Sequence, residues 1–333
     1  MTQPNAAGRT GITPELMADL LATAGRAPSL HNSQPWLFRL EGHVIELRVD
    51  ARRAMRCSDP QARELVISCG AALYNLRLAL RGKALTPDVS MAPTEDDPLL
   101  LARITAEPGP SPTHDEQRLL AAVVHRHTHR DGFAPVPIAE ALALALAVDV
   151  ATEGAQLIWV DDRTQIKALA EIVLLADQLQ VGDPAWRAEM AGWVDTDGHG
   201  RRDGVPLWAV PPVPTNQRAT DRLPTRSFVP DRAENAEAQL SGVAGRMAVL
   251  VTDGDGVADW LAAGQALQRM LVRAADAWVF ATYGTAPLEV PYLRQALREA
   301  LFLRDYPQMV LELGHAGSAH VTPRLPPTQQ RDR

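Results

Sequence analysis

The chain has 333 residues, of which 46% are hydrophobic and 22% are charged, so it can bury a large core and form two domain-sized halves. Its net charge of −7 argues against a general nucleic-acid or anionic-membrane binder, because such proteins concentrate positive charge. Two cysteines, Cys57 and Cys69, are too few for a disulfide scaffold or a thiolate metal site. Because the start does not resemble a signal peptide and no apolar run approaches ~18 residues, we expect a cytoplasmic protein without nucleic-acid or membrane partners.

Turn signals and apolar periodicity predict alternating helices and strands in the first part of the chain. The expected elements are a helix from Pro14 to about Gly25, a hairpin over 36–50, a long buried helix over 65–80 and a strand over 99–105. A Pro-rich stretch over 107–112 then marks the expected boundary between two halves, 1–112 and 113–333.

The second part repeats this alternation. The expected elements are a helix from Pro137, a strand over 156–160, a helix over 165–179, a strand over 246–252, a second long buried helix over 257–278, a helix over 291–303 and a strand over 309–313. Between residues 182 and 232 the pattern dissolves into Pro, Gly, Trp and Arg. So long an irregular stretch is typical of a functional lid or of disorder.

The segment from Ala27 to Trp36 joins the first helix to the hairpin. Two prolines stiffen it, while Ser29, Asn32 and Gln34 offer hydrogen-bonding groups without a permanent charge. Such a loop suits the polar edge of a flat heterocycle. The alternative is an ordinary capped turn whose polar side chains bind their own backbone.

A basic segment, His125 to Arg130, directly precedes the Pro137 helix. In an extended conformation Arg126, Thr128 and Arg130 share one face, and two guanidiniums beside a hydroxyl favour a phosphate. The three histidines on the other face raise the alternative of a metal site, and a solvated basic strand is a third possibility. Two shorter segments have the form of turns: 286–291, which enters a helix, and 323–326, which holds Arg324 between prolines.

Together these segments resemble the FMN-dependent nitroreductase superfamily. The residues Pro28-Ser29-x-x-Asn32-Ser33-Gln34-Pro35-Trp36 match its flavin-ring loop, Arg126-x-Thr128-x-Arg130 is similar to its phosphate motif, and Pro287-Leu288-Glu289 is similar to its Pro-Leu-Glu-Gly turn, with Val290 in place of glycine. The resemblance implies the following cofactor-binding residues: Pro28, Ser29, Leu30, Asn32, Gln34, Arg126, Thr128, Arg130, Pro287, Leu288, Glu289, Val290 and Arg324.

The order of these motifs is reversed, because the phosphate motif of the superfamily normally stands at the N-terminus. A fused pair of subunits explains the reversal, since each flavin of the ordinary homodimer lies at the subunit interface. The arrangement resembles the Acg-type branch of the superfamily. It implies an α+β protein whose tandem halves form an intramolecular pseudo-dimer, a monomer with one surviving FMN site, and an insertion over about 182–232 that acts as a lid.

The resemblance also implies a reaction. NAD(P)H would reduce the flavin, which would then reduce a small acceptor such as a nitroaromatic, a quinone or an enone. We expect no catalytic side chain and no metal ligand, because the flavin supplies the chemistry. A protein that stores FMN under a closed lid with little turnover is the alternative, and a metal-dependent hydrolase built on the His125–His129 cluster is a third reading.

Overall fold

The computed structural model describes residues 12–91, 96–195, 200–210, 220, 222–224, 226–229, 243–317 and 322–332. Its first half comprises α1 (Pro14–Ala24), β1 (Trp36–Glu41), β2 (Val44–Val49), α2 (Arg63–Gly82), β3 (Leu85–Met91) and β4 (Leu100–Pro108). The strands form an antiparallel sheet in the order β1-β2-β4-β3. The β1–β2 hairpin turns at Gly42, whose φ of +63° suits a residue without a Cβ. The predicted hairpin is therefore confirmed.

The second half repeats this order with additions. Its elements are α4 (Glu140–Thr152), β5 (Gln156–Val160), α5 (Arg163–Gly182), α6 (Pro184–Trp193), β6 (Val194–Asp195), β7 (Val205–Pro206), β8 (Arg246–Thr252), α7 (Val257–Asp276), β9 (Val279–Tyr283), α8 (Pro291–Ala300) and β10 (Tyr306–His315). The main sheet has the order β5-β8-β10-β9. These strands occupy the places of β1, β2, β4 and β3, and α4 and α7 occupy those of α1 and α2.

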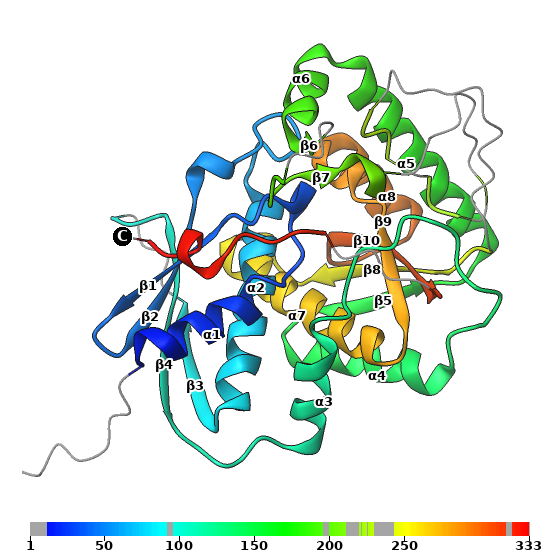
Figure 1. The fold of residues 1–333 in the computed structure, drawn as a ribbon. Coiled ribbons are helices and arrows are strands. Elements are labelled where there is room, and N and C mark those ends of the chain that lie inside the picture. The colour runs from blue at the N-terminus through cyan, green and yellow to red at the C-terminus, as the bar shows by residue number, and fades with distance from the viewer. Residues whose placement is uncertain are drawn as a thin grey trace, which may run out of the picture.

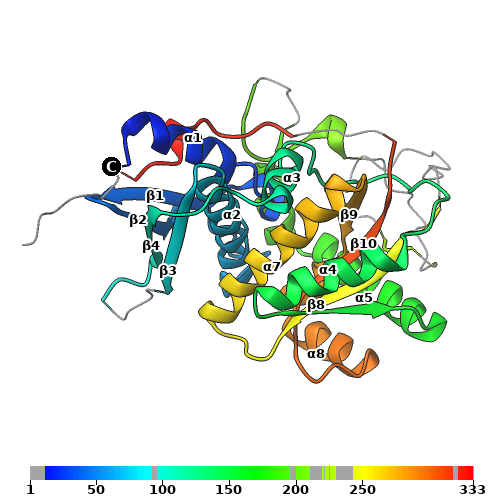
Figure 2. The same ribbon diagram turned by 90° about the horizontal axis from the view of Figure 1, so that it is seen from below.

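Helices α2 and α7 pack against each other between the two sheets, as Figures 1 and 2 show. In the first half, Leu76 of α2 and Phe38 of β1 are fully buried in one apolar cluster. In the second half, Leu267 of α7 and Leu311 of β10 are buried in another. Full burial of each such side chain contributes about 1.5–3 kcal/mol, so each sheet is fixed to its own central helix. The structure confirms an α+β protein whose two halves form an intramolecular pseudo-dimer.

Besides the additions within the second half, helix α3 (His114–Ala122) and the C-terminal tail lie outside this repeated pattern. Helix α3 follows β4 and packs on both central helices, and Thr113 and Glu116 form a capping box at its start. The C-terminal tail returns to the first half, where the amide of Phe38 donates to the backbone oxygen of Gln330 at 2.8 Å. Figure 1 shows this tail, in red, crossing from β10 towards β1. The tail therefore carries Arg324 back towards the loop that precedes β1.

The structure departs from the sequence prediction in the insertion, where residues 184–193 form helix α6 rather than an irregular segment. Asp183 caps this helix by accepting from the amide of Ala185 at 2.9 Å, and Pro184 occupies its first turn. Trp186 and Met190, four residues apart, bury one face of it. Parts of the predicted lid (196–199, 211–219, 221, 225 and 230–232) lie outside the described residues.

Smaller differences concern where elements begin. Helix α4 begins at Glu140, three residues after the expected start at Pro137. Strand β3 was not predicted, and its Pro87 is tolerated because β3 is an edge strand of its sheet. Among the described residues, no helix is both long and apolar enough to cross a membrane.

Candidate functional site

The loop between α1 and β1 holds a strained backbone. His31, Asn32 and Gln34 have φ values of 48°, 58° and 52°, a region that residues with a Cβ adopt only at a cost. Ser29 Oγ accepts from the amide of Gln34 at 2.9 Å, which closes the loop on itself. Ser68 Oγ of α2 accepts from the amide of Leu30 at 3.3 Å and ties the loop to the central helix. Strain of this kind, fixed from two sides, is typical of a preformed binding site.

The side chains of Asn32 and Gln34 anchor the loop to distant parts of the chain. Asn32 Nδ2 donates to the backbone oxygens of Gly204 at 3.0 Å and Pro323 at 3.1 Å. Gln34 Nε2 donates to the backbone oxygen of Arg202 at 2.9 Å, and its Oε1 accepts from the amide of Leu325 at 2.8 Å. These two residues therefore join the loop to the insertion and to the C-terminal tail.

Three arginines lie close together beside this loop: Arg126 and Arg130 of the basic segment, and Arg324 of the C-terminal tail. Thr128 pairs with Ala281 of β9, which holds the segment from Arg126 to Arg130 extended. Arg126 is only 4% exposed, and its Nη2 donates to the backbone oxygen of Arg26 at 3.3 Å. Within the described part of the chain, its Nε and Nη1 and the Nε of Arg324 are buried without a hydrogen-bond partner.

Their electrostatics show that the arginines repel one another. Burial, with the positive charge of Arg126, lowers the pKa of Arg130 to about 10. Burial, with the charges of Arg126, Arg26 and Arg130, lowers the pKa of Arg324 to about 9. No salt bridge to a described carboxylate compensates these guanidiniums. Because buried cations are normally paired, this cluster fits a dianionic phosphate.

A cavity begins at this cluster. Thr128 and Arg130 line it, as do the loop residues Pro28, Ser29 and Leu30. The structure thus brings five of the predicted residues, drawn from two distant motifs, to one cavity. Other lining residues were not predicted: His31 of the loop, Glu64 and Ser68 of α2, Tyr283 of β9, and Arg226 and Phe228 of the insertion.

The predicted Pro287–Val290 turn lies beside the cavity rather than in its wall. Residues Ala286–Glu289 form a short 3-10 helix, and Leu288 and Glu289 line a neighbouring pocket. The Glu289 carboxylate accepts from Gln180 Nε2 at 2.7 Å and forms an ion pair with Arg226. Through Glu289, this turn therefore fixes Arg226, a residue of the insertion that lines the cavity.

The insertion closes over the cavity through three consecutive residues. Arg226 binds Glu289, and Ser227 donates from its amide and its hydroxyl to Asp177 at 2.9 and 2.7 Å. The Phe228 ring meets the His31 ring edge to face at 5.6 Å and is 9% exposed. We call residues 226–228 the roof of the cavity.

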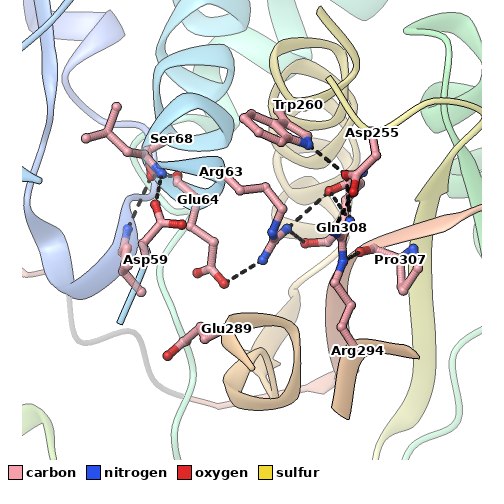
Figure 3. Close-up of polar contacts among 12 residues, drawn as sticks. Asp59, Arg63, Glu64, Ser68, Asp255, Trp260, Glu289, Arg294, Pro307 and Gln308 are labelled. Atoms are coloured by element: carbon pink, nitrogen blue, oxygen red, sulfur yellow. Dashed lines mark hydrogen bonds and ion pairs between the residues drawn. The ribbon is translucent and has the colours of Figure 1, made fainter. Parts of the chain in front are cut away.

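Figure 3 shows the polar network at the start of α2. Arg63 Nη1 donates to the backbone oxygen of Gln308 at 2.6 Å, and its Nη2 donates to Glu64 Oε1 at 2.8 Å. Gln308 Nε2 donates to Asp255, whose carboxylate also forms a bidentate pair with Arg294 at 2.6 and 2.7 Å. The network fixes Arg63, and through it the Glu64 carboxyl in the cavity wall.

At the corresponding place in the second half, the fully described connection between α4 and β5, there is no counterpart of the strained loop. In the first half eleven residues, 25–35, separate α1 from β1, whereas only residues 153–155 separate α4 from β5. On α7, the positions equivalent to Glu64 and Ser68 are Ala258 and Ala262, counted from the first residue of each helix.

The histidines of the basic segment pack as aromatic side chains. The His127 ring lies 4.1 Å from that of Phe280, and the His129 ring lies 5.0 Å from that of Phe133. In the part of the chain that is described, no group of three or more His, Cys, Asp or Glu residues is placed to hold a metal ion.

The chain matches no family model. The Mycobacterium tuberculosis protein Rv3131, provisionally named an NAD(P)H nitroreductase, is 30% identical over 320 residues, which cover 96% of this chain and 90% of that protein. The acg protein of the same organism, named in the same way, is 29% identical over 211 residues, or 63% of each chain. The crystal structure of an FMN-bound nitroreductase from Desulfitobacterium hafniense is 13% identical, with a TM-score of 0.40, over 65% of this chain and 97% of that one. From the match to Rv3131 over nearly its whole length, the chain belongs to the nitroreductase family, in its Acg-type branch.

Proposed function

We propose that the protein binds one FMN and uses it as an oxidoreductase of the nitroreductase type. The observation that supports this most is the cluster of Arg126, Arg130 and Arg324 beside a strained polar loop, in which Arg126 is buried and N–H groups of Arg126 and Arg324 have no partner among the described residues. A phosphate would neutralise this cluster and accept its free donors.

Each part of the site then has a role. Arg126, Arg130 and Arg324, with the Thr128 hydroxyl, hold the phosphate. The loop residues Pro28, Ser29 and Leu30 and the apolar face of α2 enclose the ring, while Asn32 and Gln34 maintain the shape of the loop. When bound, FMN would supply the redox chemistry, the transfer of a hydride from NAD(P)H to a nitroaromatic, quinone or enone acceptor. The roof excludes water from this reaction.

The two halves contribute differently to the proposed site. Residues 1–112 supply the ring loop, and residues 113–333 supply the phosphate cluster and the roof, so one chain provides what two subunits would. Because the α4–β5 connection has no room for a second loop, we propose one FMN per chain and a monomeric protein. The proposed partners are small molecules, in a cytoplasmic setting without nucleic acid or membrane.

One observation favours a second function, the storage of FMN. The roof is held from three sides, by Glu289, Asp177 and His31. If these contacts persist in solution, a nicotinamide cannot stack on the ring, and the protein retains flavin without turnover.

Reconstitution with FMN followed by rapid reduction tests both functions. The expected result is a yellow protein with one flavin per chain by mass spectrometry, bleached anaerobically by NADH or NADPH within seconds. A flavin-bound protein that neither nucleotide reduces would favour storage. A chain that takes up no FMN would refute both functions.

A further inference from the structure

Glu64 is the carboxyl group in the wall of the cavity, on the first turn of α2. Its side chain is buried, with the whole residue only 4% exposed. Arg63 Nη2 donates to its Oε1 at 2.8 Å, as Figure 3 shows, while its Oε2 has no hydrogen-bond partner among the described residues. One oxygen is thus held by the protein, and the other is left for a group inside the cavity.

Glu64 and Arg130 line the same cavity from different parts of the chain, Glu64 from α2 and Arg130 from the basic segment, and different charges act on them. The charged groups that most affect the pKa of Glu64 are Glu289, Arg63, Asp59 and Arg226. The groups that most affect the pKa of Arg130 are Tyr283 and Arg126. The Phe228 ring of the roof lies 5.6 Å from the His31 ring and 5.8 Å from the Arg130 guanidinium. A flavin whose phosphate lies on the arginines would therefore share this cavity with Glu64.

The same surroundings keep a proton on this carboxyl. Glu64 has two carboxylates near it, Glu289 and Asp59, and two cations, Arg63 and Arg226. Burial, reinforced by the negative charge of Glu289, raises the pKa of Glu64 to about 8 in spite of Arg63. At neutral pH the group is therefore an acid that can donate a proton.

We propose that Glu64 is a catalytic residue that protonates the acceptor during its two-electron reduction. This inference rests on the proposed function, and it narrows the acceptors to those that need a proton, such as quinones. Reduction of a quinone to a hydroquinone consumes one hydride, which originates from NAD(P)H, and one proton. The hydride forms one O–H bond, the Glu64 carboxyl loses its proton to the second oxygen, and water then reprotonates the carboxylate.

Reoxidation of the reduced flavin by different acceptors distinguishes proton donation by Glu64 from a purely structural role of this residue. The test uses FMN-loaded protein reduced anaerobically with one equivalent of NADH, then mixed with 1,4-benzoquinone or with ferricyanide, a one-electron acceptor that needs no proton. In E64Q we expect reoxidation by the quinone to slow by about 10²-fold, in the range typical of general acid catalysis, with the ferricyanide rate unchanged. In the wild type the quinone rate should fall above about pH 8, and in E64Q it should not.

A matched control and a second readout complete the test. Glu46→Gln changes another buried glutamate with arginine partners, one that does not line the cavity, and should leave both rates unchanged. In the flavin-free protein, the infrared band of a protonated carboxyl should be lost with a midpoint near pH 8 and be missing from E64Q.

Different results would overturn the proposed reductase function and the proposed role of Glu64. A chain that holds no FMN, or FMN that NADH does not reduce, overturns the proposed reductase. Normal reduction with equal effects of E64Q on both acceptors, or with none, overturns the role of Glu64 alone. An infrared midpoint below pH 5 also overturns it.

Discussion

Gly70 of α2 and Gly264 of α7 face each other where the two central helices cross. A Cβ on Gly70 would lie 2.3 Å from the backbone oxygen of Leu261, and a Cβ on Gly264 would lie 2.0 Å from that of Ile67. Each glycine is seven residues beyond the first residue of its helix, and Ile67 and Leu261 are also equivalent in this register. The contact is therefore symmetric, and it marks the axis of the pseudo-dimer.

The first prediction concerns this crossing. Gly70→Ala or Gly264→Ala places a methyl group against a backbone oxygen, and the helices must separate. We expect a loss of about 1–3 kcal/mol in the free energy of unfolding, larger than the ~1 kcal/mol that alanine gains in a helix. Urea denaturation measures the difference. Gly192→Ala, in α6 with open space around it, is the control and should be neutral or stabilising. Equal behaviour of the three variants would contradict the close contact.

The second prediction concerns the arginine cluster. Arg126→Met or Arg324→Met should weaken FMN binding by about one to two decades, because charge-assisted hydrogen bonds contribute about 1.5–3 kcal/mol, while riboflavin binding changes little. Without flavin, Arg126→Met should raise the free energy of unfolding by about 1 kcal/mol or more, since a buried unpaired charge is removed. Flavin fluorescence quenching and urea denaturation measure the two effects.

The control for this experiment is Arg269→Met, which removes an arginine paired with Asp149 and Glu153. It should destabilise the protein and leave FMN binding unchanged. If Arg126→Met instead weakened FMN and riboflavin binding equally, Arg126 would support the fold and not the phosphate.

Much of this fold could be predicted from the sequence because its central elements have strong local signals. The apolar period of α2 and α7 and the alternation around Gly42 predict these elements without knowledge of the rest. Helix α3 was missed although Thr113 and Glu116 form a capping box, a signal that could have identified it. Strand β3 was missed because it is largely exposed and contains Pro87, so its pairing with β4 depends on the rest of the sheet.

The residues of the candidate site were likewise predictable from the sequence only where their signal is local. Arg126, Thr128 and Arg130 were predicted because alternation along an extended segment is a local property. The roles of Asn32 and Gln34 as anchors could not be predicted, since their partners lie more than 160 residues away along the chain. Glu64 could not be distinguished from other helix-start glutamates, because its significance comes from its burial beside Glu289.

The third prediction is a pH dependence of stability. The pKa of Glu64 is raised from its usual 4.5 to about 8, so the folded protein retains a proton that the unfolded chain releases. The resulting stabilisation is complete below pH 4.5 and is lost as the pH rises to about 8. The free energy of unfolding of the wild type, relative to E64Q, should therefore fall over this window by a few kcal/mol, at ~1.4 kcal/mol per pKa unit. Denaturation of both flavin-free proteins at a series of pH values measures it, and parallel curves would indicate an ordinary carboxyl.

The last prediction addresses the roof, because the roof separates reduction from storage. The Phe228 ring lines the cavity, meets His31 and lies 5.8 Å from the Arg130 guanidinium, so the side chain that shields a bound ring also retains it. Phe228→Ala should therefore speed flavin reduction by NAD(P)H and speed FMN release together, since both steps need the same opening. Stopped-flow absorbance measures the first rate, and flavin fluorescence after dilution measures the second. Trp208→Ala, an exposed residue of the same insertion, should change neither. Slower reduction with FMN still bound would mean that Phe228 forms part of the nicotinamide or acceptor site, and the storage function would then lose its structural support.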